Sequence, residues 1–130
     1  MILIPDTHTL LWFLADDPKL GRSAKEALLR RENIEIVIPI IVLFEISHLQ
    51  KKRGLSISLA DIHHWITGNA HVRVHPIDIA VLDATPEGLE IHDAMIAGTA
   101  VVLSRSSPGD VVVATCDQML ARCKAVKVIW

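Results

Sequence analysis

The chain has 130 residues, of which 51% are apolar, and this length is typical of one domain with a substantial core over residues 1–130. The formal net charge of −2 excludes a global basic field for nucleic acid, so any contact with nucleic acid must use local patches. The mean hydropathy of +0.39 is high for a soluble monomer and predicts an interface with another chain in addition to the core.

Short apolar runs alternate with helical patterns along the first half of the chain. We predict, in order, a strand at residues 2–4, helices at 7–15 and 23–31, a strand at 35–38, helices at 39–52 and 59–67, and a strand at 72–75. Ser23 followed by Glu26 has the spacing of a capping box, which predicts Ser23 as the N-cap of its helix. Gly54 and Gly68 are expected to end the two later helices.

The second half continues the alternation. We predict a short helix at residues 78–84, a helix at 92–106, a strand at 111–115, a helix at 117–123 and a final strand at 126–129. Strands rich in β-branched residues that alternate with helices favour a three-layer α/β/α fold with a central, mostly parallel twisted sheet.

Neither a membrane span nor a secretory leader is expected. The longest apolar run, residues 36–44, is far shorter than the roughly 18 residues that cross a bilayer. The apolar N-terminus lacks a basic leader and is interrupted by Asp6. Cys116 and Cys123 do not have a metal-binding spacing, and we expect two buried thiols in a protein of the reducing cytoplasm.

Four acidic side chains interrupt segments that are otherwise apolar: Asp6, Glu45, Asp93 and Asp117. Carboxylates are rare in core-forming segments unless they are paired, and no lysine or arginine is placed comparably. Two carboxylates about 4 Å apart repel by roughly 4 kcal/mol at an effective dielectric constant of about 20. A divalent cation is therefore the simplest missing partner.

The predicted elements give these four acids a common location. Asp6 and Asp117 each follow a strand and precede a helix, and ligands of open α/β sheets bind beyond the carboxyl ends of the strands. Glu45 lies about a turn and a half into its helix and Asp93 lies near the start of its own, so both can project over the same edge. Oxygen ligands suit Mg²⁺ or Mn²⁺ better than zinc, and the natural reaction is metal-assisted hydrolysis of a phosphodiester.

Four motifs in chain order resemble those of PIN-domain ribonucleases of the VapC toxin type. The opening Asp6-Thr7-His8 with Leu-Leu-Trp after it is similar to the start of that family, and Val-Leu-Phe-Glu-Ile at 42–46 is similar to its second motif. The segment 91–100, in which an aspartate begins an alanine-rich helix, resembles the third, and Thr-Cys-Asp at 115–117 resembles the fourth. The match covers essentially the whole chain.

This resemblance implies a PIN-like fold and a metal-dependent endoribonuclease, usually the toxin of a toxin–antitoxin pair. It implies Asp6 and Asp93 as the main Mg²⁺ (or Mn²⁺) ligands, with Glu45 and Asp117 completing the set directly or through water and Thr115 orienting it. RNA is then the substrate. A cognate antitoxin would cover apolar surface near the first helices, and a homodimer is expected.

The chain also departs from the family. Pro5 stands where an aliphatic residue is usual, and because proline cannot donate to a sheet ladder, we expect the first strand to end early. Ala94 follows Asp93 where an arginine is common. The basic segment 51–53 at a helix C-terminus is explained by the helix dipole alone, although it could also meet RNA phosphates.

Several simpler interpretations compete with a metal site. Asp6, Asp93 and Asp117 could each be the N-cap of a helix, whereas no helical neighbour of Glu45 offers a cation. The seven histidines are scattered, and those next to site acids are expected to take surface or supporting roles.

Other functions also remain open. A phosphatase with a strand-end aspartate nucleophile needs a second aspartate where His8 stands. A His-Asp phosphohydrolase, suggested by His92-Asp93, needs a helical fold, which strands at both termini disfavour. A non-catalytic PIN scaffold used for binding or dimerisation would have no need of four mutually repelling acids.

Overall fold

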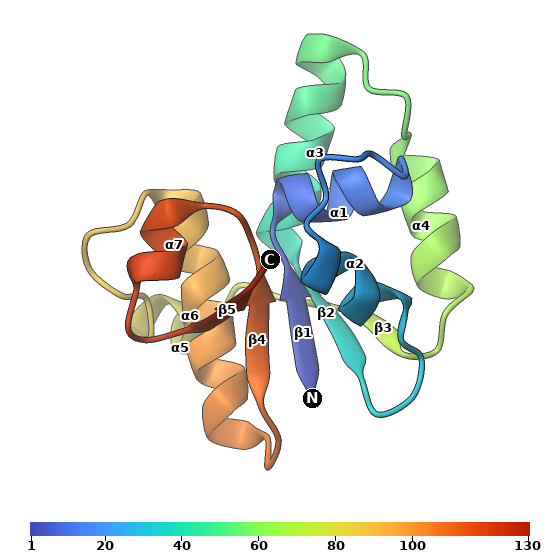
Figure 1. Cartoon of the computed structure of the whole chain (residues 1–130). Coiled ribbons are helices and arrows are strands. Elements are labelled where there is room, and N and C mark those ends of the chain that lie inside the picture. The colour runs from blue at the N-terminus through green and yellow to red at the C-terminus, as the bar shows by residue number, and fades with distance from the viewer.

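Five strands form one sheet in the middle of the molecule, in the order β3-β2-β1-β4-β5 (Figure 1). The strands are β1 (Ile2–Pro5), β2 (Glu35–Pro39), β3 (Val72–His75), β4 (Val111–Ala114) and β5 (Lys127–Ile129). The computed structural model describes all 130 residues. Every neighbouring pair of strands is parallel, so the carboxyl ends of all five strands lie at one edge of the sheet.

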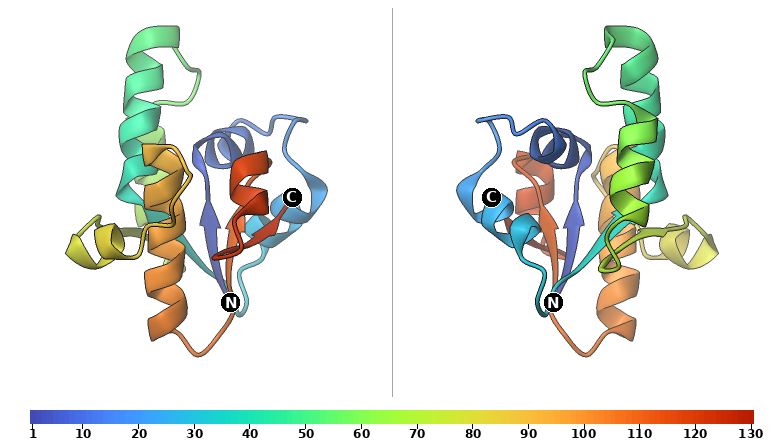
Figure 2. Two further views of the ribbon diagram at one scale, coloured as in Figure 1. Left: turned by 90° about the vertical axis from the view of Figure 1, so that its left-hand side faces the viewer. Right: turned by 90° about the vertical axis from the view of Figure 1, so that its right-hand side faces the viewer.

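Helices cover both faces of this sheet. They are α1 (Thr7–Leu14), α2 (Arg22–Leu29), α3 (Ile40–Arg53), α4 (Leu59–Thr67), α5 (Ile79–Asp83), α6 (Ile91–Ser106) and α7 (Gln118–Arg122). Figure 2 shows α2 and α7 on one side of β1 and β4, with α5 and α6 on the other. The predicted three-layer α/β/α fold is thus confirmed, and the sheet is parallel throughout. None of the helices is both long and apolar enough to cross a membrane.

The strands are apolar throughout because both faces of the sheet are covered. Leu3, Ile4, Ile36, Ile38 and Val113 are fully buried, although consecutive residues of a strand point to opposite faces. The inner strand β1 is paired on both sides, with β2 and with β4. The residues that follow β1 therefore lie at the centre of the sheet edge that is formed by the carboxyl ends of the strands.

The expectation that Pro5 ends the first strand early is wrong, because β1 extends through Pro5, which pairs with Ala114 of β4. The backbone N–H groups of Ile2 and Asp6 donate to β4 and its approach, at Asp110 and Ala114, so the even-numbered residues bond on that side. The odd-numbered position of Pro5 faces β2, so the N–H group that proline lacks would have pointed towards β2. The pairing with β2 has already ended at Leu3 and Ile36, so no ladder bond is lost.

The second helix differs from its prediction at both ends. It begins at Arg22, with Gly21 as N-cap, so Ser23 lies inside the first turn and caps nothing. The carboxylate of Glu26 accepts from Arg22 Nε at 2.9 Å instead of reaching back to Ser23. The helix ends at Leu29 because Arg30 is extended.

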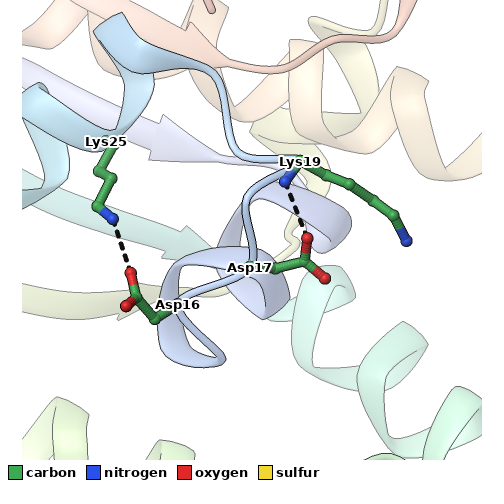
Figure 3. Close-up of polar contacts among 4 residues, drawn as sticks. All are labelled: Asp16, Asp17, Lys19 and Lys25. Atoms are coloured by element: carbon green, nitrogen blue, oxygen red, sulfur yellow. Dashed lines mark hydrogen bonds and ion pairs between the residues drawn. The ribbon is translucent and has the colours of Figure 1, made fainter.

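The loop between α1 and α2 is held by its own acidic residues (Figure 3). Lys25 Nζ lies 2.6 Å from Asp16 Oδ1, and Asp17 Oδ1 accepts from the backbone N–H of Lys19 at 2.8 Å. Asp16 has a φ of 49°, a conformation that aspartate tolerates better than most residues. Both acids thus have a local structural role.

Helix α6 approaches α5 closely at Gly98, which is buried. A Cβ added at Gly98 would lie 2.7 Å from the carbonyl oxygen of Val81 and 3.1 Å from Thr85 Cγ2. We expect Gly98→Ala to lower the free energy of unfolding by about 1–3 kcal/mol through overpacking, despite alanine's better helix propensity. Urea unfolding followed by circular dichroism measures this.

The matched control is Ser104→Ala in the same helix. Ser104 is exposed, and its hydroxyl bonds only to the Val101 carbonyl of its own helix. This substitution should be neutral or stabilise by about 0.5 kcal/mol. A gain in stability for Gly98→Ala would contradict a fixed α5–α6 contact.

Candidate active site

A cleft of about 560 Å³ opens at the carboxyl edge of the sheet. It is built by the turns after β1 and β4 and by α1, α3, α6 and α7, which surround that end of the two strands in Figure 1. All four acids singled out in the sequence line it: Asp6, Glu45, Asp93 and Asp117. No lysine or arginine lines it.

Asp6 is buried directly after β1, and its two oxygens have different partners. Oδ1 accepts from the backbone N–H of Thr9 at 2.8 Å, so Asp6 is indeed the N-cap of α1. Oδ2 accepts from the hydroxyl of Thr115, which is itself buried after β4. The hydroxyl oxygen of Thr115 accepts from the backbone N–H of Asp117 at 2.9 Å. Thr115 therefore links the acids at the ends of β1 and β4.

Glu45 has partners from two other helices. Its Oε2 accepts from the hydroxyl of Thr7 in α1. Its Oε1 lies 2.7 Å from Nδ1 of His92 in α6, and the pair is an ion pair when the imidazole is protonated. His92 thus holds a site acid, which the sequence did not reveal because the two residues belong to helices far apart in the chain.

Asp93 and Asp117 differ in how their carboxylates are engaged. Asp117 caps α7, and its Oδ1 accepts from the backbone N–H groups of Met119 at 2.7 Å and Leu120 at 3.0 Å. Asp93 is not an N-cap, because α6 begins two residues earlier with Glu90 in the cap position. Its carboxylate has no hydrogen-bond partner in the protein and is half-buried in the cleft. Asp93 is the acid least satisfied by the protein itself.

The electrostatics of the cleft also distinguish Asp93 from the other acids. Burial first, and then the charges of Asp117, Glu45 and Asp6 in that order, together raise the pKa of Asp93 from 3.8 to about 6. Both causes disfavour the charged carboxylate. The cleft is therefore a concentrated negative site without a cation of its own.

The donor set suits a hard divalent cation, since four carboxylates offer oxygen ligands and Asp93 lacks a counter-charge. No three of the metal-binding side chains are gathered into a ready-made ligand set. Asp6 accepts hydrogen bonds at both oxygens and Asp117 at one, while Glu45 accepts from Thr7 and lies at ion-pair distance from His92. Asp93 is the one acid of the four without any hydrogen-bond partner in the protein, so both of its oxygens are available to a cation.

The cleft is also lined by residues that were not given a site role from the sequence, among them His8, Trp12 and Cys116. The prediction of two buried thiols is wrong, because Cys116 is exposed and Cys123 is half-buried. Since β4 ends at Ala114, Cys116 lies in the turn at the sheet edge, and its position next to Asp117 was the available signal. Partial burial, followed by the charge of Asp6, raises the pKa of its thiol.

The sequence profile of the PIN domain matches residues 3–126. The chain belongs to the PIN domain family. Solved structures share the fold: VapBC2 from Rickettsia felis bound to a promoter DNA fragment has a TM-score of 0.71 at 16% identity, over 99% of this chain and 98% of that chain.

Two further solved structures resemble this PIN domain. VapBC from Salmonella typhimurium bound to DNA has a TM-score of 0.62 at 20% identity, covering 99% of this chain and 97% of that chain. A toxin–antitoxin complex from Klebsiella pneumoniae has a TM-score of 0.63 at 17% identity, covering 98% and 96%. At these identities the likeness concerns the fold. No curated protein sequence matches significantly.

The raised pKa of Asp93 predicts a pH-dependent gain in stability for Asp93→Asn in metal-free PIN domain. The folded state holds the Asp93 proton up to about pH 6, whereas the unfolded chain releases it near the usual value of 3.8. The charged carboxylate therefore costs stability above pH 6, and this cost disappears as the pH falls towards 4. We expect Asp93→Asn to be more stable by ~1 kcal/mol at pH 7.5, allowing for solvent screening, and by close to nothing at pH 4.

Urea unfolding with a chelator present measures this difference at each pH. The control is Asp83→Asn, which removes an exposed carboxylate outside the cleft and should show no such pH dependence. A stability difference for Asp93→Asn that stays constant from pH 4 to pH 7.5 would contradict the electrostatic interpretation of the cleft.

Proposed function

We propose that this PIN domain is a metal-dependent endoribonuclease that hydrolyses RNA phosphodiester bonds with Mg²⁺ or Mn²⁺. The observation that carries the proposal is the gathering of four carboxylates in one cleft that contains no lysine or arginine, with the Asp93 pKa raised to about 6. Such an arrangement is unfavourable for the protein alone and suits a bound divalent cation.

Asp6 and Asp93 would be the main metal ligands, with Glu45 and Asp117 completing the set directly or through water. A bound cation would supply charge neutralisation, polarisation of the phosphodiester and a more acidic water. The chain supplies the orientation of the acids. Thr115 fixes Asp6 through its hydroxyl and Asp117 through the backbone, as the supporting residue of the site.

Glu45 is held separately from this pair of acids. Thr7 and His92 each bond one of its oxygens, so its carboxylate is fixed from two helices. These two contacts explain how the Glu45 carboxylate stays directed into the cleft, although α3 itself supplies no cation to pair with it. A separate observation concerns phosphatase chemistry with an aspartate nucleophile. His8, rather than the second aspartate which that chemistry needs, stands two residues after Asp6.

The biological setting that we propose is a toxin held by a cognate antitoxin. The resembling structures are described as VapBC and toxin–antitoxin complexes, which supports this setting. Exposed apolar side chains offer surface for an antitoxin and for a homodimer: Leu29, Phe44, Ile79, Leu82 and Ile91 are each at least 60% exposed. A molar mass of a single chain in light scattering would contradict the dimer.

The test is cleavage of single-stranded RNA by the purified protein. We expect cleavage in Mg²⁺ or Mn²⁺, none in excess chelator, and a loss of more than ~100-fold in Asp93→Asn, because removal of a ligand should exceed the roughly 10- to 100-fold cost of losing a ligand's hydrogen-bond partner. The same cations should raise the melting temperature of the wild type but not of Asp93→Asn.

Asp83→Asn is the matched control and should cleave as the wild type does, because Asp83 lies at the end of α5 outside the cleft. Cleavage that persists in chelator would rule out the metal mechanism. Absence of both cleavage and any effect of cations on the melting temperature would instead indicate a non-catalytic PIN scaffold.

Thr115 tests whether the hydrogen bonds between the acids matter for activity. Thr115→Val removes the hydroxyl that donates to Asp6 and accepts from Asp117, and we expect cleavage to fall roughly 10- to 100-fold. Thr115→Ser keeps the hydroxyl and should retain most of the activity. Equal activity of the valine and serine variants, measured at saturating Mn²⁺, would show that the hydroxyl has no part in the reaction.

A further inference from the structure

A second hollow of about 410 Å³ lies beside the catalytic cleft. It is formed by α1, the loop after α1, the C-terminal end of α3 and the segment that follows α3. His8 and Trp12 line both this hollow and the catalytic cleft, so the two spaces adjoin. We call this second space the side hollow.

Lys19 and Arg53 give the side hollow the positive charge that the cleft lacks. Both are exposed, and neither side chain takes part in an ion pair or hydrogen bond within the protein. In this they differ from Arg22, Lys25, Arg73 and Lys127, which are paired with acids. The two cations of the side hollow are therefore available to a ligand.

The backbone of Lys19 is held in place, whereas its ammonium has no carboxylate partner. Its backbone N–H is held by Asp17, and the preceding Asp16 is paired with Lys25. Figure 3 shows the Lys19 side chain extending away from both of these carboxylates. Its Nζ lies 5.9 Å from the centre of the Trp12 ring, which places the charge at the boundary between the side hollow and the cleft.

The remaining lining suits a nucleotide. Leu11, Leu49, Leu55 and Ile57 provide an apolar surface for a base or a sugar. One acid, Asp17, also lines the side hollow, but its Oδ1 is occupied by the backbone N–H of Lys19. The side hollow thus combines an apolar floor with two unpaired cations.

The acidic cleft repels a polyanionic substrate, and the positive charges of Lys19 and Arg53 can offset this repulsion. A metal ion in the cleft neutralises charge around the phosphate that is cut, whereas the neighbouring phosphates of the strand are still repelled by the carboxylates. Unpaired lysine and arginine side chains next to the cleft are suited to bind these phosphates.

We propose that the side hollow binds nucleotides that flank the cleavage point in single-stranded RNA, with Lys19 and Arg53 contacting their phosphates. The inference rests on the proposed nuclease function and assigns the path of the strand, which leads from the cleft past His8 and Trp12 towards the end of α3. Arg53 thereby differs from its neighbours Lys51 and Lys52, which do not line the side hollow.

The binding test uses the full chain carrying Asp93→Asn, with chelator present, so that RNA is bound without being cut. Fluorescence anisotropy of a labelled single-stranded RNA gives the binding constant between about 50 and 200 mM salt. For Lys19→Ala/Arg53→Ala we expect binding at least ~10-fold weaker and a slope of log K against log salt reduced by about 0.7 per lost phosphate contact.

The matched control is Lys51→Ala/Lys52→Ala, which removes the same charge from the same end of α3 outside the side hollow. It should change the salt slope much less. Equal effects of the two double variants would overturn the proposal, because they would reflect net charge alone. Unchanged RNA binding in Lys19→Ala/Arg53→Ala would also overturn it and would leave the side hollow to a protein partner.

Measurements of RNA cleavage distinguish a failure of this inference from a failure of the proposed function. In a chain with Asp93 intact, Lys19→Ala/Arg53→Ala should raise KM several-fold more than it lowers kcat. If the wild type binds RNA through these residues but cuts no RNA, the nuclease function fails and the binding site stands. If the wild type cuts RNA and the double variant has an unchanged KM, the nuclease function stands and the side hollow is not on the path of the strand.

Discussion

The pairing between β1 and β4 is the constraint on which the site depends. Pro5 pairs with Ala114, so the residues that immediately follow the two strands, Asp6 and Thr115, meet at the edge of the sheet. The backbone N–H of Asp6 donates to the Ala114 carbonyl, and the hydroxyl of Thr115 then reaches the Asp6 carboxylate. A slip of one residue would send alternate side chains to the opposite face and separate the two. The parallel sheet is therefore part of the site and not merely its support.

The acids at this edge illustrate how one fold separates structural from reactive roles. Asp6 and Asp117 each use an oxygen to cap a helix, and Glu45 is bonded at both oxygens, so these three serve the folded structure as well. Asp93 has no such partner, and burial together with the neighbouring acids raises the pKa of its carboxyl to about 6. A protein under selection for stability alone would have no reason to keep a half-buried, unpaired acid there.

The sequence predicted those features that depend on local pattern. Asp6 and Asp117 could be placed because strand-to-helix junctions of a parallel sheet share one edge, and the fold followed from the alternation of apolar strands with helices. The pairing of Glu45 with His92 could not be predicted, because it depends on how α3 packs against α6. The start of α2 was missed for a different reason, since an ion pair between Arg22 and Glu26 replaced the capping box that the spacing indicated.

Pro5 has a consequence for the backbone pairing of the sheet at this edge. Beyond Leu3 and Ile36 the strands β1 and β2 continue without pairing with each other, while each remains paired with its outer neighbour. Because proline has no backbone N–H, Pro5 could not donate a ladder hydrogen bond to β2 at this point. The hydroxyl of Thr7, which lies just after β1, donates to the carboxylate of Glu45 in α3, the helix that follows β2. This bond joins the start of α1 to α3 at the edge where the ladder between β1 and β2 has already ended, so a side-chain contact there takes the place of backbone pairing.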